Sequence, residues 1–368
     1  MVVATLLATN AQLAEPLPED EVTRIAESIS RYDPTFDITE QKLSYNLAER
    51  EGARLRFSPS HGWMFFDGTR WARDIGGLRA QELVKNMITE LRASIESIEE
   101  FDSTQRASLM KAAKGLERRA PITSIQKLSM SAPGIYDDGH WDDPAMLINF
   151  SNGTLHLPDV ELRPHASVGR LTKILPYDYD PSAECPNFEK VLADVLEPDV
   201  VQYLQRLFGY ALGGTGQEHT FPILIGAGRN GKSTIVEAVA HAFSAYSTAA
   251  AASTFLKGNK SSINNDVAAL AGSRLVRISE LNAGEVLDSA LVKQISGGDM
   301  ISARFLHHEH FQFKSNAVIM MMTNAPPVFD GSDAALARRL VFIRFGNVIR
   351  PEDVDQKMPD KLRLEHLR

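Results

Sequence analysis

Apolar and polar positions alternate differently in successive segments of the chain, and each pattern predicts a different element. Residues 54–73 alternate around an Asp-Gly pair, which is typical of a tight turn and predicts a β-hairpin. Residues 80–118 carry apolar side chains at helical spacing, with a turn and a new helix cap at Asp102, so we expect a helical hairpin. An Asn-Gly pair within 146–157 predicts a second β-hairpin. The N-terminal half is therefore expected to mix α and β structure.

The C-terminal half combines one amphipathic helix with several short apolar strands. Residues 201–212 have helical periodicity and end at two glycines, and four apolar segments follow at 221–225, 274–279, 317–322 and 340–345. A proline-rich stretch over 175–187 lacks periodicity, so we place a domain boundary near residue 187. The expected parts are a helical segment or linker at 1–36, a mixed α+β domain at 37–187, a motif-bearing domain at 188–350, and a C-terminal extension at 351–368.

Composition narrows the class of protein. The chain has 368 residues, 43% hydrophobic and 23% charged, which is ordinary for a globular protein of two domains. No run approaches the roughly 20 apolar residues of a membrane span, and the start lacks a basic signal region, so we expect a cytoplasmic protein without a membrane partner, in the host cytoplasm if it is viral. The net charge of −8 requires any DNA site to be local. A single cysteine, Cys185, provides neither an internal disulfide nor a zinc pattern.

The strongest chemical motif is the loop Gly226 to Ser233, which reads G-A-G-R-N-G-K-S between an apolar strand and a helix. This is the phosphate-binding loop of nucleoside triphosphatases in its required context. The glycines let backbone N–H groups surround phosphates, Lys232 reaches the β and γ phosphates, and Ser233 holds Mg²⁺. The fixed positions match by accident about once in a hundred chains of this length. We therefore predict an ATP site with Mg²⁺, whose nucleotide-contacting residues are Gly226, Gly228, Arg229, Asn230, Gly231, Lys232, Ser233 and Thr234.

Three further strands end or begin with polar side chains that suit this chemistry. The strand from Arg274 ends in Glu280, which is where the acid that polarises the attacking water belongs. The next strand ends in Asn324, a candidate sensor of the γ phosphate, although Asn-Ala-Pro-Pro is also an ordinary strand-ending turn. Arg338 and Arg339 precede the last strand, and one of them is a candidate arginine finger supplied to a neighbouring subunit.

In this order, the motifs resemble those of superfamily 3 helicases. The likeness rests on G-A-G-R-N-G-K-S, RLVRISELN, LVKQISGGDMISARFLHHEHFQF, MMTNAPP and ARRLVFIRF, and upstream on GWMFFDGTRW, LINFSNGTLHL and LTKILPYDYDPSAECPNFEKVL. It is strongest to the phage and plasmid primase-helicase group and to the poxvirus primase-helicase, and it covers most of the chain from about residue 40 to 350.

The resemblance implies an α/β fold: an AAA+ type ATPase core with a central, mostly parallel sheet, preceded by a mixed α+β collar-like domain. It also implies a homo-hexameric ring that hydrolyses ATP between subunits and moves 3′ to 5′ along single-stranded or forked DNA. By position, Lys232 and Ser233 are the Walker A residues, Glu280 is the Walker B acid that also serves Mg²⁺, and Asn324 is the sensor. Arg339 aligns best as the finger, and Lys293 matches a position that contacts ATP from the adjacent subunit.

The same resemblance places a channel hairpin in SARFLHHEHFQF, so that Arg304, His307 and His308 are candidates for contacts to DNA phosphates. Position 279 is serine where many relatives carry a second acid. The chain ends where relatives continue, which predicts a truncated C-terminal extension. No cluster of primase carboxylates is found, because the acidic pairs near residues 137 and 142 have the composition of a loop. The segment 20–32 resembles the tail of a module that follows a primase-polymerase domain, so we expect such a module in a larger parent chain.

Two other functions share these motifs. A ring-forming helicase loader would use ATP to hold DNA without separating strands. A P-loop kinase of small molecules would need a monomeric acceptor pocket and would show no stimulation by DNA.

Overall fold

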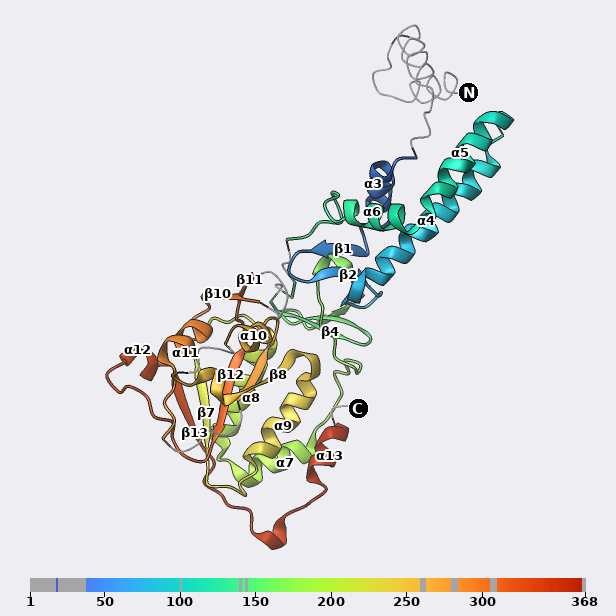
Figure 1. Cartoon of the computed structure of the whole chain (residues 1–368). Helices are drawn as coiled ribbons and strands as arrows, with labels where there is room; N and C mark the ends of the chain where they lie inside the picture. The colour runs from blue at the N-terminus through green and yellow to red at the C-terminus, as the bar shows by residue number, and fades with distance from the viewer. Residues whose placement is uncertain are drawn as a thin grey trace. The chain divides into compact units, whose positions relative to one another are not determined.

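The computed structural model describes residues 18, 38–99, 101–138, 141–142, 145–258, 263–278, 284–304 and 310–365. Figure 1 shows the elements along the chain. A five-stranded sheet in the order β13-β7-β12-β9-β8 lies at the centre of the C-terminal half, and all its strand pairs are parallel. Its strands are β7 (Phe221–Ile225), β8 (Ser247–Ala250), β9 (Leu275–Ile278), β12 (Val318–Thr323) and β13 (Leu340–Arg344). The predicted α/β class with a parallel sheet is confirmed.

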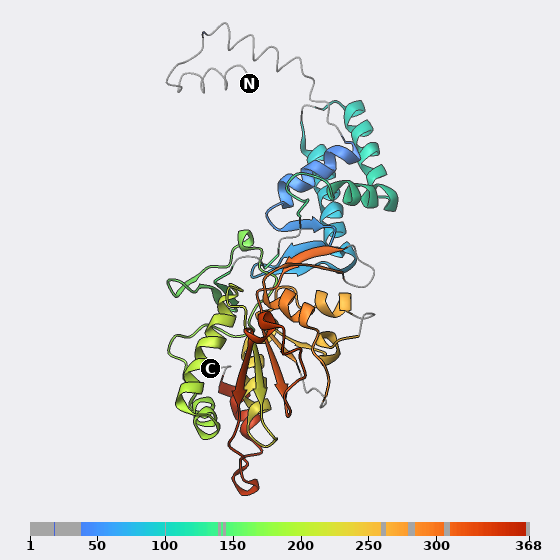
Figure 2. The same cartoon turned by 90° about the vertical axis from the view of Figure 1, so that its left-hand side faces the viewer.

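Helices cover both faces of this sheet, as expected for parallel strands that are buried on both sides. One face packs against α7 (Pro186–Val195), α8 (Pro198–Gly213) and α9 (Lys232–Phe243), and Figure 2 shows α7 and α8 in yellow-green on one side of the strands. The other face packs against α10 (Ile263–Ala268), α11 (Ser289–Ser296) and α12 (Ala334–Ala337). Alternate side chains of β12 divide between the two cores: Val318, Met320 and Met322 enter one, Ile319 and Met321 the other.

Two small antiparallel sheets precede the parallel sheet. The first has the order β1-β2-β3, formed by β1 (Leu55–Ser58), β2 (Gly62–Phe66) and β3 (Trp71–Arg73), and the Asp-Gly turn lies between its last two strands as predicted. The second has the order β4-β5-β6, formed by β4 (Leu147–Phe150), β5 (Gly153–His156) and β6 (Glu161–Arg163). Both predicted hairpins are confirmed.

The described helices of the N-terminal half are α3 (Glu40–Glu51), α4 (Leu78–Ser97), α5 (Ser103–Leu116) and α6 (Arg119–Ser129). Asp102 caps α5 by accepting from the backbone N–H groups of Thr104 and Gln105, so the predicted break in the helical hairpin is confirmed. The expected helix within 20–32 lies outside the described residues. A hairpin of β10 (Met300–Ala303) and β11 (Phe311–Lys314) and a C-terminal helix, α13 (Met358–Glu365), complete the fold.

Contacts divide the chain into two compact units. One contains Met1–Glu49 and Gln81–Ala132, and its described part is a helical unit with a core that includes Leu47, Ile88 and Ile125. The other contains Arg50–Ala80 and Pro133–Arg368, so it holds all three sheets and the hairpin. The domain boundary near residue 187 stays a prediction. None of the described helices is long and apolar enough to cross a membrane.

A buried guanidinium joins the N-terminal strands to the parallel sheet. Arg274, only 4% exposed, directly precedes β9 and donates from its Nη1 to the Gly213 carbonyl at 2.8 Å and from its Nη2 to the Leu147 carbonyl at 3.4 Å. Its carbon Cζ lies 5.9 Å from the ring centre of Tyr246. Burial lowers the pKa of Arg274, but its ordinary pKa is high enough for the side chain to stay charged. A buried charge is stabilised only when its hydrogen bonds are made, so these carbonyls are fixed in place.

Tyr246 and Asn149 extend this buried polar network. The backbone N–H of Asn149 donates to the Tyr246 hydroxyl at 3.0 Å, and burial raises the pKa of that phenol to about 12. The Asn149 amide donates to the carbonyls of Thr69 and Lys173, and its oxygen accepts from Thr154 and His165, with the histidine as donor through Nδ1. Asn149 is fully buried, so these partners replace the water it would otherwise bind.

Two glycines in and after α8 provide a matched test of the Arg274 site. Gly214 has φ +59°, and a Cβ there would lie 1.2 Å from Nη1 of Arg274. Gly214→Ala should therefore lower the free energy of unfolding by more than about 2 kcal/mol, since it combines backbone strain with displacement of a buried charge. Gly209→Ala meets no atom within 4 Å and should raise it by about 0.5–1 kcal/mol. Urea unfolding measures both, and equal effects would contradict this role of Arg274.

Candidate nucleotide site

The predicted phosphate-binding loop connects β7 to α9, so its expected strand and helix flanks are confirmed. Gly228, Arg229 and Gly231 adopt positive φ values of 93°, 50° and 73°. Left-handed conformations at these positions turn the chain sharply before α9, and they are easiest for glycine. The loop tip around Gly228 is exposed, whereas the residues that anchor it are buried.

Lys232 is held beneath the loop. Its side chain is 3% exposed, and its Nζ donates to the Gly226 carbonyl at 2.9 Å, the Thr323 carbonyl at 2.8 Å and Oδ1 of Asn324 at 3.2 Å. The ammonium group thus bridges the loop and the end of β12. These acceptors compensate for the burial of a positive charge, and they leave that charge at the edge where the predicted phosphates would lie.

Asn230 fixes the loop from below. This side chain is 3% exposed, and its amide donates to the Phe345 carbonyl at 3.3 Å while its oxygen accepts from the backbone N–H of Lys232 at 3.4 Å. Gly226 lies directly above it, where a Cβ would approach Nδ2 of Asn230 to 1.9 Å and the Phe345 carbonyl to 2.8 Å. Position 226 therefore requires glycine because of close packing. Positions 228 and 231 favour glycine for a different reason, their positive φ values.

Ser233 and Thr234 occupy the first turn of α9, where Ser233 is exposed and Thr234 half-buried. The N-terminus of a helix favours anions, and an exposed hydroxyl beside it suits a phosphate-bound Mg²⁺. The residues present thus fit a magnesium nucleotide: an anchored glycine loop, a buried ammonium and an exposed hydroxyl share one edge.

The other predicted residues of this edge are described in part. Asn324 directly follows β12, is exposed, and accepts from Lys232 as stated above. The register of β12 against β9 pairs Met321 with Ile278, so the carboxyl ends of these strands adjoin. Glu280 and Ser279 lie outside the described residues, and the predicted Walker B role of Glu280 stays a prediction.

The predicted intersubunit residues gather at the opposite edge of the sheet. The Arg339 carbonyl accepts from the backbone N–H of Phe221, at the amino end of β7. Five residues of strand separate Phe221 from Gly226, which is about 16 Å at the usual rise. Nζ of Lys293 pairs at 2.7 Å with Oδ2 of Asp333, whose other oxygen caps α12 by accepting from Leu336.

Arg338 and Arg339 differ in their surroundings. Arg339 is half-buried and its Nη1 donates to the Ala335 carbonyl of its own helix at 2.7 Å. Arg338 is exposed, and its side chain makes no hydrogen bond or ion pair with any residue that the structure describes. Arg338 adjoins Arg339 at the amino end of the sheet, and Lys293 is paired with Asp333, which lies shortly before these arginines in sequence.

The predicted channel hairpin is present as β10 and β11, paired from Met300 opposite Lys314 to Ala303 opposite Phe311. Arg304 follows β10 and is exposed, whereas His307 and His308 lie outside the described residues. Phe311, at the loop end of the hairpin, contacts the first small sheet, where the His61 ring centre lies 5.9 Å from that of Phe311.

Several features of the site and of the fold were not predicted from the sequence. Asp333 was not singled out, although an aspartate three residues before an apolar helical position is a capping signal. The contact of Asn230 with Phe345 has no local signal, because 115 residues separate the two in sequence. Neither the 119–129 helix nor the 358–365 helix was predicted, since both are short and begin or lie near prolines.

Three family models match the sequence. The model described as D5 N terminal like matches residues 44–197, and a family of unknown function, DUF5906, matches residues 224–339. The model Primase C terminal 1 matches residues 2–35, which agrees with the resemblance noted for that segment.

The chain is similar to a viral protein in sequence and to two solved structures in fold. L207/L206 of Acanthamoeba polyphaga mimivirus, which is provisionally named a helicase, is 26% identical over 225 residues; the match covers 59% of this chain but only 23% of the viral protein. The C-terminal region of NrS-1 is similar in structure, with a TM-score of 0.53, 12% identity, and coverage of 88% of this chain and 66% of that one. A second structure of that region, residues 305–718, has a TM-score of 0.54, 12% identity, and coverage of 90% and 68%. This likeness shows a shared fold.

The packing at Gly226 predicts a selective loss of nucleotide binding. Gly226→Ala should displace Asn230 and disorder the loop, so that a fluorescent ATP analogue binds at least tenfold more weakly while the far-ultraviolet circular dichroism is kept. Gly346→Ala, which meets no atom within 4 Å and adjoins the same carbonyl of Phe345, is the matched control and should bind as the parent does. Undiminished binding by Gly226→Ala would refute the site.

Proposed function

We propose that this chain, which belongs to a phage and viral primase-helicase family, is the ATP-driven motor of a replicative DNA helicase that works as a ring. The observation that carries this proposal is that the basic residues suited to a nucleotide site lie at two opposite edges of one sheet. Lys232 lies at the carboxyl edge, and Arg338, Arg339 and Lys293 lie near the amino edge. Side chains at the amino edge are too far away to complete their own subunit's nucleotide site.

A ring supplies the missing half of each site. In a head-to-tail ring the amino edge of one subunit faces the carboxyl edge of the next, so every phosphate-binding loop receives an arginine from its neighbour. Phosphoryl transfer depends mainly on positioning and on stabilising the charge that spreads over the γ phosphate. Lys232 and Ser233 would hold the phosphates and Mg²⁺, Glu280 would orient the attacking water, and Asn324 would report the state of the γ phosphate. We take this ring to be a hexamer.

The hairpin of β10 and β11 is the proposed DNA contact. Arg304 from each subunit, with His307 and His308, would meet the phosphates of single-stranded DNA in the channel and give binding without sequence preference. Movement is proposed to be 3′ to 5′. The rival function is that of a helicase loader, which would retain DNA in the presence of ATP without separating its strands.

The central prediction concerns Lys232. Lys232→Ala removes the buried ammonium from the phosphate site, so ATP hydrolysis and unwinding of a forked duplex should both fall below about 1% of the parent. Lys190→Ala, at an exposed lysine of α7, is the control and should leave both unchanged. Fluorescence separation of a labelled fork measures unwinding. If the Lys232→Ala protein unwinds normally, the helicase proposal is wrong; if the parent retains forks but never separates them, the loader is correct.

The finger is tested by mixing subunits. The sequence aligned Arg339 with this role, and that assignment stays a prediction; the side-chain contacts favour Arg338, which is exposed while Arg339 is bonded to its own helix. Arg338→Ala should slow hydrolysis by roughly 10³. Mixing it with Lys232→Ala subunits should restore part of the activity, because some interfaces then contain both intact groups. If only a mixture of Arg339→Ala and Lys232→Ala subunits regains activity, Arg339 is the finger. If neither mixture regains activity, the site is not shared between subunits.

A further inference from the structure

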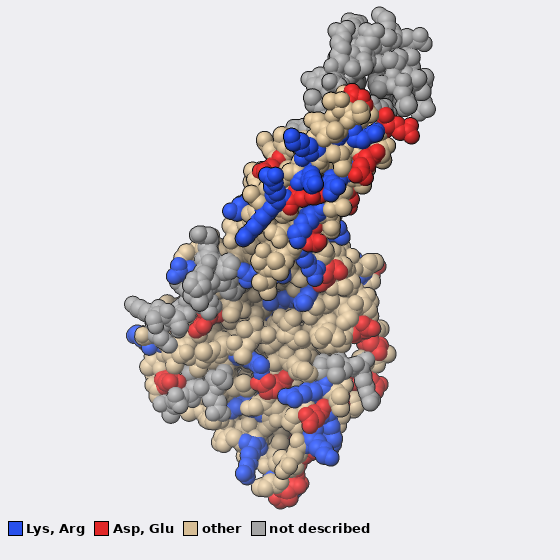
Figure 3. All heavy atoms as spheres, turned by 45° about the vertical axis from the view of Figure 1, so that its right-hand side comes forward, with Lys and Arg blue, Asp and Glu red and all other residues tan. Residues whose placement is uncertain are grey.

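The helical unit carries a concentration of positive charge that the proposed motor does not use. Between Arg106 and Lys127 the chain has six Lys or Arg residues and one Glu, a net charge of +5 in a chain whose total is −8. Figure 3 shows blue Lys and Arg side chains on the face of this unit, with red Asp and Glu side chains among them. The single acid, Glu117, is already paired with Arg92.

Most of these cations have no partner among the residues that the structure describes. Five of them are exposed and make no ion pair or hydrogen bond through their side chains with the residues that the structure describes; they are Lys111, Lys114, Arg118, Arg119 and Lys127. An ordinary solvated surface intersperses charges of both signs, which neutralise one another at short range. Within residues 106–127 the positive charges outnumber the negative by five, and a local excess of this kind attracts a polyanion from solution.

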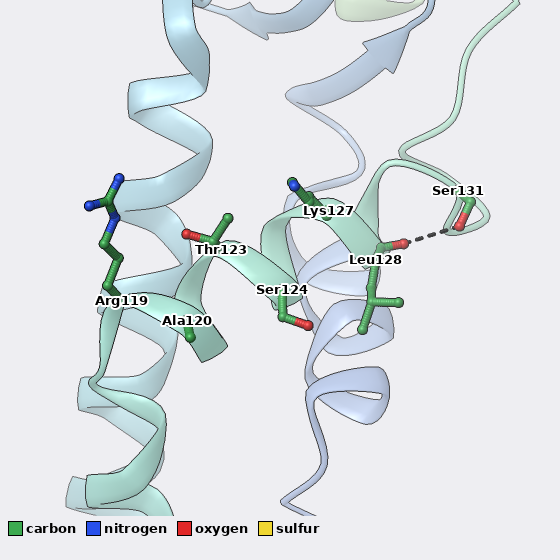
Figure 4. A pocket seen from close by; sticks show the side chains of 7 residues that line it. All are labelled: Arg119, Ala120, Thr123, Ser124, Lys127, Leu128 and Ser131. Atoms are coloured by element: carbon green, nitrogen blue, oxygen red, sulfur yellow. Dashed lines mark hydrogen bonds between the residues drawn. The ribbon is translucent and has the colours of Figure 1, made fainter.

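Two of these cations, Arg119 and Lys127, line a groove on α6. An open hollow of about 680 Å³ runs along the helix, and Figure 4 shows Arg119, Thr123 and Lys127 pointing the same way from successive turns. The two cations are eight residues apart, or roughly 12 Å along the axis, which corresponds to three or four nucleotide steps of a stacked strand. Neither hydroxyl of Thr123 and Ser124 has a hydrogen-bond partner among the described residues, so both are available as donors to phosphate oxygens.

We propose that the α5–α6 surface, defined by Lys111, Lys114, Arg118, Arg119 and Lys127, is a second DNA site that binds the phosphate backbone outside the motor. The choice of DNA as the ligand rests on the proposed function, since a helicase is in constant contact with DNA. The residues that line the groove include no aromatic side chain on which a base could stack. Contacts are therefore made to phosphates, and the site shows no preference among bases.

The salt dependence of binding tests this site in the full chain. Without nucleotide, anisotropy of a labelled 30-mer of thymidine is measured between about 50 and 200 mM salt, beside a duplex of equal length. Arg119→Ala combined with Lys127→Ala should weaken binding in at least one arm by about tenfold and reduce the slope of log K against log salt by about 1.4, or 0.7 for each lost contact to a single strand. The control pair, Lys42→Ala with Lys85→Ala, removes the same charge from exposed positions of the same unit and should change neither quantity.

Each outcome of this experiment tests the α5–α6 surface and leaves the proposed motor function untested. Unchanged affinity and slope in both arms, or an equal loss in the control pair, overturns the proposal and leaves the motor untouched. Displacement of the DNA by polyglutamate of equal charge also overturns it, because the surface would then suit an acidic protein. Basal ATP hydrolysis is followed in parallel and should stay at the parental rate, so failure of the Lys232 prediction remains distinguishable from failure here.

Discussion

The parallel alignment of five strands is the constraint on which the arrangement of charges depends. Because every strand runs the same way, all carboxyl ends meet at one edge and all amino ends at the other. The loop that holds Lys232 and the turn that holds Asn324 must then adjoin, while Arg338 must lie a strand length away. Under the proposed function, a phosphate bound at the carboxyl edge and the Arg338 guanidinium at the amino edge can be brought together only by a second copy of the chain.

Local sequence was sufficient wherever the determining contacts are local. Four strands of the parallel sheet, the two hairpins, the Asp102 cap and the glycine end of α8 were predicted, because periodicity and turn chemistry act over a few residues. The same holds for the flanks of the nucleotide loop. The edge strand β8 was not predicted, since its residues, Ser247–Ala250, are small and form no apolar run. The parallel sheet was expected from the family resemblance, and the pairing order of its strands was not predicted, because hydrophobic runs identify strands without saying which ones are neighbours.

The missed features depend on partners far apart in the chain. Arg274 reads in sequence as a polar residue before an apolar strand, yet it is buried and bonded to carbonyls 61 and 127 residues away. The contrast between Arg338 and Arg339 likewise cannot be read from two adjacent identical letters, since it arises from the path of α12. The basic surface was hidden by the acidic total, because net charge averages over regions that DNA would meet separately.

The shared core of the larger unit bears on how the molecule can be divided. Ile148, which precedes the proline-rich stretch, and Leu175, its first residue, are buried in the same aliphatic core as Leu204 and Ile235, and Tyr177 donates to the Ala242 carbonyl at the end of α9. A fragment beginning at residue 188 would therefore expose to water the aliphatic surface that these two side chains cover, and would leave Arg274 without the Leu147 carbonyl. Any fragment of this chain that keeps the parallel sheet should therefore also keep the strands of residues 147–163, which share its aliphatic core.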